Sequence, residues 1–465
     1  MNDVFDSAAF SEEMDRLTGS KERRGNSCLF LPSGVQSYRE RWRLLSEARS
    51  QVHAVAFSVM NDDTSRRMAS EMVRLSRSGA QTRLILDDGV YWSTFCGKIL
   101  RTIEAGGGEV LHYHKVFRGL MPDLAQGSPF RQIARNVKLK LKRHFHEKYM
   151  VVDGTHAVLG GLNWGDKYAL GGQEPKAWRD TDVLLGGPVV ADIQDRFVTD
   201  WYRYRCQNEQ ADNLRRAGFS PEECEERWKR RESADREAFR ERWFPRLEPT
   251  GDLPIRYVAH KPWDENRGAL TNAMLHVIAN AKETLWWGCH GIRPPRMLAE
   301  ALLDAAARGV DVRLFTNSKV SARTLMLRGL FGWMYWESSN HYKHLLEGGI
   351  RIFEWQKPGA FHSKNLVADN AFASVGSYNI ANGSTFHHTE SNVFVRDRTF
   401  AEQVADQFEI DMRDCREITL AEARTPDPRN DPYLRPLRDR CFTVDRSVWP
   451  RSVAHDLDAG NYLPF

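Results

Sequence analysis

The sequence predicts an α/β protein of two similar lobes, each a largely parallel sheet flanked by helices. Three observations predict this fold. The chain has 465 residues, which is ample for two packed domains. The order strand, helix, strand, strand occurs once in each half, and strands that alternate with helices of this length form right-handed units with parallel strands. The same polar motif then follows the third strand in each half.

In the first half, the apolar run AVAFSV at 54–59 predicts a strand. Helical spacing through Met68 and Met72 follows it, and Gly79 ends this helix before the apolar letters RLIL. A third strand is expected at 107–113. These elements form one βαβ unit with an added strand.

The second half repeats this order from residue 283 to 318. Its helix runs through Leu298 and Leu302 and stops at Gly309, before the apolar letters VDVRLF. A third strand is expected at 348–355. The shared order indicates an internal duplication.

Composition divides the rest of the chain. The segment around 222–244 is densely charged and has no turn residues, which predicts a solvated helix, whereas the stretch after Thr425 is rich in Pro, Asp and Arg. The expected segments are an N-terminal extension at 1–27, a first lobe at 28–205, a charged helical linker at 206–250, a second lobe at 251–420 and an irregular C-terminal strap at 421–465.

The bulk composition excludes several classes of protein. The formal net charge of +4 gives no general reason to expect nucleic acid as a partner. The seven cysteines are scattered, so neither structural zinc nor a disulfide framework is expected. The acidic start has no apolar core of a secretory signal, and no run of about eighteen apolar residues predicts a membrane span.

The repeated motif reads H-x-K-x4-D-x6-G-[G/S]-x-N. Its first copy is HEKYMVVDGTHAVLGGLN, which ends at Asn163, and its second is HSKNLVADNAFASVGSYN, which ends at Asn379. The apolar letters after each lysine predict a buried strand, on which residues i and i+2 share a face. We therefore expect His146 and Lys148 to project together, as His362 and Lys364 do in the second copy.

These residue types suit the binding and transfer of a phosphoryl group. Lysine and asparagine donate hydrogen bonds to phosphoryl oxygens, and no cage of carboxylates for a divalent metal accompanies them, so no metal or cofactor is expected. Two half-sites that face each other would supply two histidines. One can attack phosphorus while the other protonates the leaving alkoxide. Face-to-face packing of the lobes would place this site between them.

The paired motifs resemble those of the phospholipase D superfamily, and the wider sequence is similar to its bacterial cardiolipin synthase branch. The similarity spans roughly residues 28–415 and includes the letters WRDTDVLLGGPVV and TESNVFVRD. It implies a two-step reaction through a phosphohistidine, with His146 as nucleophile and His362 as general acid and then base. This assignment of the two histidines is the usual one in the family, and the reverse assignment stays open.

The resemblance also implies roles for the other motif residues. Asp180 and Glu390 match the acids that hold the histidines in the useful tautomer. Asp153 and Asp369 are expected to be buried structural partners rather than participants in proton transfer. The candidate catalytic residues are His146, Lys148, Asp153, His362, Lys364 and Asp369. The candidate phosphate-binding residues are Asn163, Asn379, Ser377 and the two lysines.

Two further segments suggest a lipid surface as partner. A long insertion before His146 ends in the basic letters VKLKLKR at 137–143, which predicts either a substrate-guiding rim or an ordinary basic surface element. Aromatic residues crowd 324–349, which predicts a buried helix or a surface that dips into lipid. We expect a cytoplasmic protein bound peripherally to the inner membrane, with anionic glycerophospholipids as substrates and no prediction of oligomeric state.

The leading functional hypothesis is a phosphatidyltransferase of the cardiolipin synthase type. A hydrolytic phospholipase D would use the same residues with water as acceptor, and acceptor choice depends on water exclusion and pocket shape. A nuclease is disfavoured by the small net charge and by the lack of a long basic and aromatic groove. A lipid-binding scaffold without catalysis is disfavoured because both motifs are intact.

Overall fold

The computed structural model describes most of the chain. The described residues are 4–87, 94–113, 143–213, 220–262, 268–323 and 328–425, together with 437–438, 448 and 462–463. Almost all of the basic insertion, and most of the C-terminal strap, lie outside them. Within the described part of the chain, no helix is both long enough and apolar enough to cross a bilayer.

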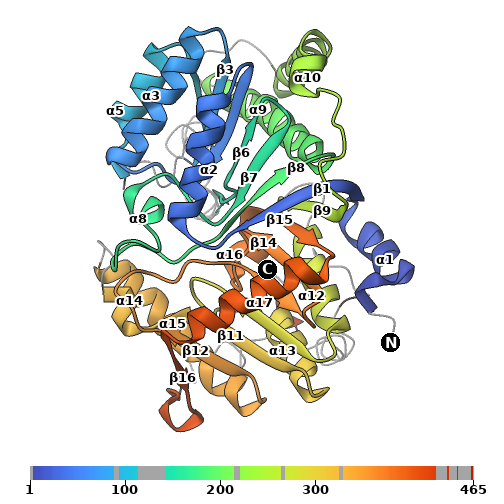
Figure 1. The fold of residues 1–465 in the computed structure, drawn as a ribbon, viewed down its shortest axis with the longest axis vertical. Helices are drawn as coiled ribbons and strands as arrows, with labels where there is room; N and C mark the ends of the chain where they lie inside the picture. Colours follow the sequence, from blue (N-terminus) through green and yellow to red (C-terminus); the bar gives the residue numbers. More distant parts are fainter. Residues whose placement is uncertain are drawn as a thin grey trace.

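One sixteen-stranded sheet runs through both lobes (Figure 1). The strands of its first part are β1 (Glu22–Leu31), β2 (Gln51–Ala56), β3 (Gln81–Asp87), β4 (Glu109–Tyr113), β5 (His144–Phe145), β6 (Tyr149–Val152), β7 (His156–Gly160) and β8 (Asp182–Gly186). Those of its second part are β9 (Leu253–His260), β10 (Thr284–Gly288), β11 (Asp311–Asn317), β12 (Arg351–Trp355), β13 (Leu366–Ala368), β14 (Phe372–Gly376), β15 (His388–Val395) and β16 (Cys415–Ile418).

Helices cover the sheet in both lobes. In the first half they are α1 (Ala8–Thr18), α2 (Gly34–Glu47), α3 (Asp63–Arg77), α5 (Gly97–Ala105), α8 (Asp166–Ala169), α9 (Val189–Asn213), α10 (Pro221–Ala238) and α11 (Arg240–Trp243). In the second they are α12 (Ala269–Asn280), α13 (Arg296–Ala307), α14 (Lys319–Arg323), α15 (Arg328–Glu347), α16 (Asn382–Phe386) and α17 (Arg398–Met412). The predicted duplicated α/β fold is confirmed.

The sheet is mixed rather than largely parallel. Its order is β16-β12-β11-β10-β13-β14-β15-β9-β1-β8-β7-β6-β2-β3-β4, with β5 paired to β15. Parallel neighbours within this order are limited to β2–β3–β4 and β10–β11–β12. The motif strands return through tight turns as the hairpins β6–β7 and β13–β14, and a short turn can join only antiparallel strands.

The two lobes share a sheet and a core. Strand β1 runs along the boundary between the lobes (Figure 1) and pairs with β8 on one side and β9 on the other. One hydrophobic cluster draws residues from both halves, and the rings of Phe30 and Phe400 lie 5.8 Å apart within it. The lobes are therefore held together by backbone pairing and by apolar burial.

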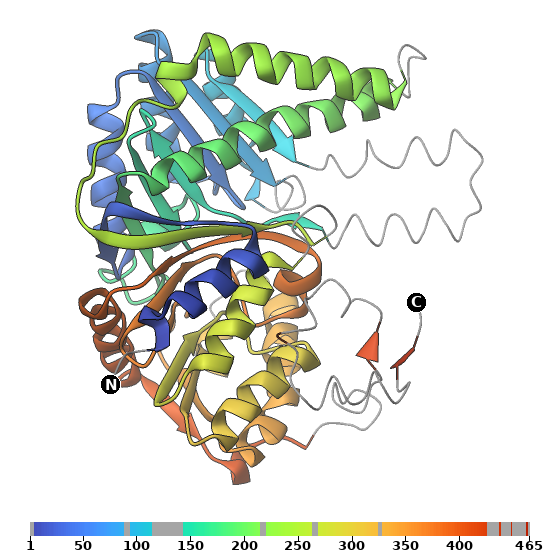
Figure 2. The same ribbon diagram turned by 90° about the vertical axis from the view of Figure 1, so that its right-hand side faces the viewer.

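Three of the expected segment boundaries fall inside elements. The boundary at residue 28 lies within β1, the one at 205 lies within α9, and the one at 420 lies within a 3-10 helix at Leu420–Glu422. The lobe limits stay predictions. The charged segment contains α10, whose N-terminus is fixed by a capping box between Ser220 and Glu223. This helix lies alongside α9 (Figure 2).

Both motif aspartates hold turns together. Asp153 and Asp369 have left-handed backbone angles, with φ of 50° and 52°. The carboxylate of Asp153 accepts hydrogen bonds from the backbone N–H groups of residues 49–51, next to the start of β2. Asp369 accepts the equivalent bonds from residues 282–284, next to the start of β10. Each aspartate thus ties its motif hairpin to the neighbouring strand.

Replacing Asp153 should destabilise the fold. We expect Asp153→Ala to lower the free energy of unfolding by about 2–3 kcal/mol, because three backbone donors lose a charged acceptor. Asp153→Asn should lose less, since asparagine tolerates a positive φ and keeps one acceptor oxygen. Urea denaturation of the three proteins measures the difference, and equal stability of Asp153→Ala and the parent would contradict the assigned role.

Candidate active site

The two H-x-K segments lie just before the buried motif strands. His146 and Lys148 occupy the extended stretch between β5 and β6, and His362 and Lys364 precede β13. The sequence placed them within the strands, but the assigned strands begin one residue after Lys148 and two after Lys364. The ammonium group of each lysine donates to the carbonyl oxygen of the histidine in its own motif. The histidine and the lysine of each motif therefore lie together.

Each histidine is held by a carboxylate from the other lobe. His146 Nδ1 lies 2.9 Å from Glu390 Oε2, across 244 residues of sequence. His362 Nδ1 lies 2.5 Å from Asp180 Oδ2, across 182 residues. A backbone hydrogen bond between the lobes accompanies each of these contacts. The N–H of His146 donates to the carbonyl oxygen of Thr389, and the N–H of His362 donates to the carbonyl oxygen of Arg179. Neither half-site is complete without the other lobe.

Burial governs the charge of the two histidines. Both side chains are more than nine-tenths buried. Burial, and then the ammonium groups of Lys148 and Lys364, hold the pKa of His146 well below its usual value. The pKa of His362 is lowered by burial, by Lys364, and further by the groups at Lys148 and His146. The two half-sites therefore act on each other electrostatically, and both imidazoles are neutral near pH 7.

The pKa values of the buried lysines and acids shift in the directions expected when charged groups are removed from water. Burial lowers the pKa of Lys148 to about 7 and also lowers that of Lys364. It raises the pKa of both Asp180 and Glu390 to about 7. The lysines are each 1% exposed and the acids 0%. An anion placed between the lysines would favour their charged form.

The two motif asparagines position loops at the site. The side-chain oxygen of Asn163 accepts the backbone N–H of Ser58, and that of Asn379 accepts the backbone N–H of His290. Asn163 also donates its amide hydrogen to the hydroxyl of Tyr168. Both carboxamides therefore hold the loops that follow β2 and β10, and their role as phosphate ligands stays a prediction.

The hydroxyl of Ser377 contacts the Glu390 carboxylate. Its hydroxyl donates to Glu390 Oε2 at 2.5 Å, and the hydroxyl of Ser384 donates to Oε1 at 2.5 Å. The equivalent residue in the first half is Gly161, where a Cβ atom would lie 2.0 Å from Asp180 Oδ1. Glycine is thus required beside Asp180, whereas the longer Glu390 leaves room for a serine. The expected phosphate contact of Ser377 stays a prediction.

The structure places further rings at the site, of which the sequence offered only His388, as a possible headgroup contact beside Glu390, and not Phe57 or Trp178. The rings of Phe57 and His388 lie 4.8 and 5.4 Å from that of His146. Trp178 lies 5.0 Å from the ring of His362. His388 and Trp178 each precede their lobe's acid by two residues, in the letters HTE and WRD. This shared offset was the signal that could have found them.

Comparison with known proteins identifies relatives of this chain. The family model described as cardiolipin synthase, PLD-like domain matches residues 42–201 and 274–412. The major cardiolipin synthase of Bacillus subtilis is 25% identical over 399 residues, which cover 85% of this chain and 71% of that protein. Cardiolipin synthase 2 of Staphylococcus epidermidis is 24% identical over 397 residues, which cover 85% and 70%.

A solved structure shows the same fold. The phosphatidylserine synthase of Haemophilus influenzae superposes with a TM-score of 0.64 at 12% identity, covering 91% of this chain and 96% of that one. The duplicated fold and the paired half-sites define a phospholipase D-like protein. The chain belongs to the cardiolipin synthase, phospholipase D-like domain family.

A side chain at Gly161 should disrupt the second half-site. In Gly161→Ala the new methyl group would overlap the Asp180 carboxylate, so His362 loses the partner that fixes its tautomer. We expect the turnover number to fall by at least about 100-fold, in line with other enzymes whose histidine loses its acid. Ser377→Ala is the matched control, because it removes only a hydroxyl at the equivalent position and should lose less. Equal losses in steady-state assays would contradict the steric argument.

The buried acids predict a steep acid limb in the pH profile. Their raised pKa values mean that both carboxylates take up protons as the pH falls through about 7, and a protonated acid no longer stabilises the imidazole Nδ1–H. We expect log(kcat/KM) to fall toward acid pH with a slope approaching two. In Glu390→Gln, which cannot titrate, the slope should approach one. A slope of two in this variant would contradict the assignment.

Proposed function

We propose that the protein is a phosphatidyltransferase of the cardiolipin synthase type, which transfers a phosphatidyl group between phospholipids through a phosphohistidine. The crossed pairs of His146 with Glu390 and of His362 with Asp180 carry this proposal. Both pairs cross the interface between the lobes, and the buried ammonium groups of Lys148 and Lys364 each contact the histidine of their own motif, which supports the proposal. The family match and the names of the similar proteins support phospholipids as substrates.

In the first step, His146 Nε2 attacks phosphorus while its Nδ1–H donates to Glu390. The bond from phosphorus to the leaving alcohol breaks, and His362 gives that oxygen a proton. In the empty site, Lys364 and Lys148 lower the pKa of His362 and so disfavour its protonated form. A bound phosphodiester, which is anionic, favours the protonated form. In the second step, His362 takes the proton of the acceptor hydroxyl, whose oxygen attacks phosphorus and breaks the bond to His146.

The choice of His146 as nucleophile is supported by the environment of its acid. Glu390 accepts hydrogen bonds from Ser377 and Ser384 as well as from His146. Three donors fix this carboxylate and stabilise the positive charge that develops on the imidazole during attack. Asp180 accepts a backbone N–H from Thr181 besides its contact with His362. Glu390, which accepts more hydrogen bonds than Asp180, is therefore the acid that contacts the proposed nucleophile.

Burial of the reacting groups favours transfer to an alcohol over hydrolysis. All six charged or titratable groups of the crossed half-sites are more than nine-tenths buried, so bulk water has little access to the imidazoles. An acceptor that brings its own binding surface, such as a second phospholipid, displaces the remaining water. This supports the transferase over a hydrolytic phospholipase D with the same residues.

Product analysis tests the proposal. Incubation of the purified protein with phosphatidylglycerol should give cardiolipin and glycerol, which chromatography and mass spectrometry resolve. His146→Ala should give neither product at a detectable rate, because the covalent step is lost. Phosphatidic acid and glycerol as the sole products would overturn the transferase and establish the hydrolase.

We further propose that the protein acts at an anionic membrane surface. The exposed Trp336 has cations on its ring, with Lys319 Nζ 4.9 Å and Arg424 Cζ 5.3 Å from the centroid. The neighbouring Val320 is also exposed. An aromatic ring with adjacent cations suits the interface of an anionic bilayer. Of the basic run proposed for the same role, Arg143 alone lies among the described residues.

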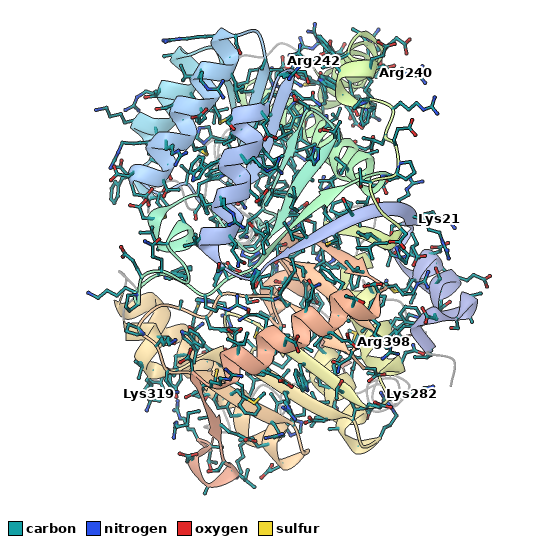
Figure 3. All side chains as sticks on the ribbon, in the orientation of Figure 1. Lys21, Arg240, Arg242, Lys282, Lys319 and Arg398 are labelled. Carbon is teal, nitrogen blue, oxygen red and sulfur yellow. The ribbon has the colours of Figure 1, made fainter. Side chains whose placement is uncertain are left out.

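Vesicle binding should depend on salt and on this surface. Each basic residue near anionic lipid contributes roughly 1 kcal/mol, and salt screens the attraction. We expect Lys319→Glu to weaken sedimentation with phosphatidylglycerol vesicles, and added salt to weaken binding of the parent. Lys282→Glu is the matched control, since Lys282 points outward on the opposite side of the second lobe (Figure 3). Binding that ignores ionic strength would contradict this proposal.

A further inference from the structure

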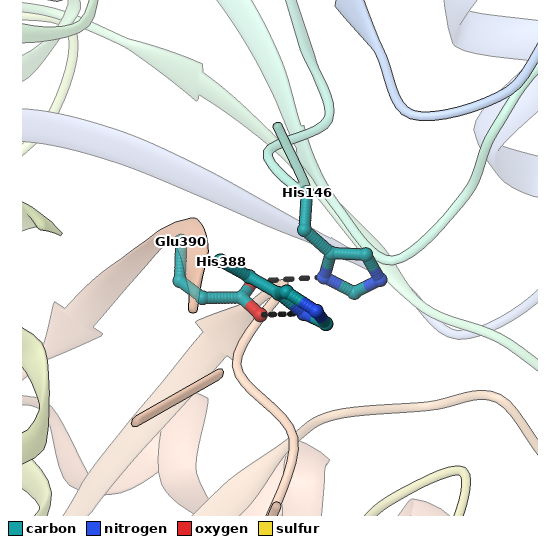
Figure 4. A group of neighbouring side chains, drawn as sticks. All are labelled: His146, His388 and Glu390. Atoms are coloured by element: carbon teal, nitrogen blue, oxygen red, sulfur yellow. Dashed lines mark hydrogen bonds and ion pairs between the residues drawn. The ribbon is translucent and has the colours of Figure 1, made fainter. Parts of the chain in front are cut away.

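The first half-site contains a group of possible metal ligands that the transfer reaction does not use in full. Ligand atoms of His146, His388 and Glu390 all lie within 4.8 Å of one another. Figure 4 shows both imidazoles directed at the Glu390 carboxylate, one toward each oxygen. His146 Nδ1 lies 2.9 Å from Oε2, and His388 Nδ1 lies 3.8 Å from Oε1.

His388 has an unused nitrogen in this group. The separation of 3.8 Å from Glu390 Oε1 is too long for a hydrogen bond. Its Nδ1 is buried from solvent and has no hydrogen-bond partner among the described residues. A buried polar atom without a partner is costly, so this nitrogen is available to a ligand that enters the site.

The distances suit a small divalent cation. Zn²⁺ binds imidazole nitrogen and carboxylate oxygen at about 2.0–2.2 Å, so two of its tetrahedral ligands lie about 3.4 Å apart. The distances of 2.9 Å from His146 Nδ1 to Glu390 Oε2 and of 3.8 Å from His388 Nδ1 to Glu390 Oε1 lie on either side of that value. Ser377, Ser384 and His146 use three of the roughly four acceptor positions of this carboxylate, which leaves one for a cation.

The duplication supplies a comparison within the same chain. The residue equivalent to His388 in the second half-site is Trp178, which cannot bind a cation through a lone pair. His362 and Asp180 therefore have no third ligand at that position. The difference limits the metal-binding arrangement to the first half-site among the described residues.

We propose that His146, His388 and Glu390 form a binding site for a first-row divalent cation, with Zn²⁺ as the best match, and that its occupation inhibits the enzyme. Two histidines and a glutamate are a common ligand set for zinc, with the fourth position left to water. Binding at His146 Nδ1 leaves the proton of the neutral ring on Nε2, whereas binding at Nε2 uses the lone pair directly. Either mode removes the nucleophile.

Direct binding tests the site independently of turnover. The full chain, freed of metals with a chelator, is titrated with Zn²⁺ alone in a calorimeter. One equivalent should bind, and His388→Gln should weaken its affinity at least about 10-fold, because a lost ligand costs no less than a lost second-sphere partner. His156→Gln, which removes a histidine outside the group, should bind as the parent does. No stoichiometric binding, or unchanged affinity in His388→Gln, overturns the site.

The inhibitory part is measured as the ratio of phosphatidylglycerol turnover with and without Zn²⁺ in each protein. Zn²⁺ should suppress turnover of the parent reversibly on addition of a chelator, and His388→Gln should require at least about 10-fold more Zn²⁺. Equal sensitivity of the two proteins overturns the inhibition. Melting temperatures without metal show whether His388→Gln is folded, and His388→Asn replaces it if it is not. Absence of turnover in the parent contradicts the proposed function but leaves the calorimetric result to decide the site.

Discussion

The crossed pairing of histidine and carboxylate is the constraint on which the rest of the structure depends. His146 is oriented by Glu390 and His362 by Asp180, so each lobe supplies the histidine of one half-site and the carboxylate that orients the histidine of the other. Such contacts form only if the lobes meet in one register. The continuous sheet through β1 and β9, the shared core and the parallel pairing of β5 with β15 fix that register. Separate lobes would retain both histidines without their orientation.

The cost of burying so much charge explains what the site can bind. Lys148 and Lys364 are almost fully buried beside two acids whose pKa values are raised to about 7, so the empty site holds its charges poorly. In the proposed reaction, the negative charge of a phosphodiester would favour the protonated form of Lys148, of Lys364 and of one imidazole. The same electrostatics would then serve both substrate binding and proton transfer.

The sequence predicted the duplication and the motif units, because both follow from local spacing. It predicted the two positioning acids, Asp180 and Glu390, only through the resemblance to the phospholipase D superfamily. It could not predict which acid serves which histidine, since 244 residues separate His146 from Glu390 and local pattern carries no information about that distance. The hairpins after the H-x-K segments were missed as antiparallel strands because buried apolar runs look alike in both kinds of sheet. The motif pattern admits glycine or serine at the position of Gly161 and Ser377, and the steric need for glycine at 161 is visible only where the structure places Asp180 beside it.

The most direct measurement is an experimental structure of the protein with vanadate, an analogue of the phosphoryl group in transfer. A single vanadate should lie between His146 and His362, with one imidazole Nε2 bonded to vanadium, the other within hydrogen-bond reach of a vanadate oxygen, and both lysines as donors. The carboxylates of Glu390 and Asp180 should remain on the opposite Nδ1 atoms. Two vanadates on separate faces, or one bound to an imidazole that the other cannot reach, would contradict a shared site between the lobes.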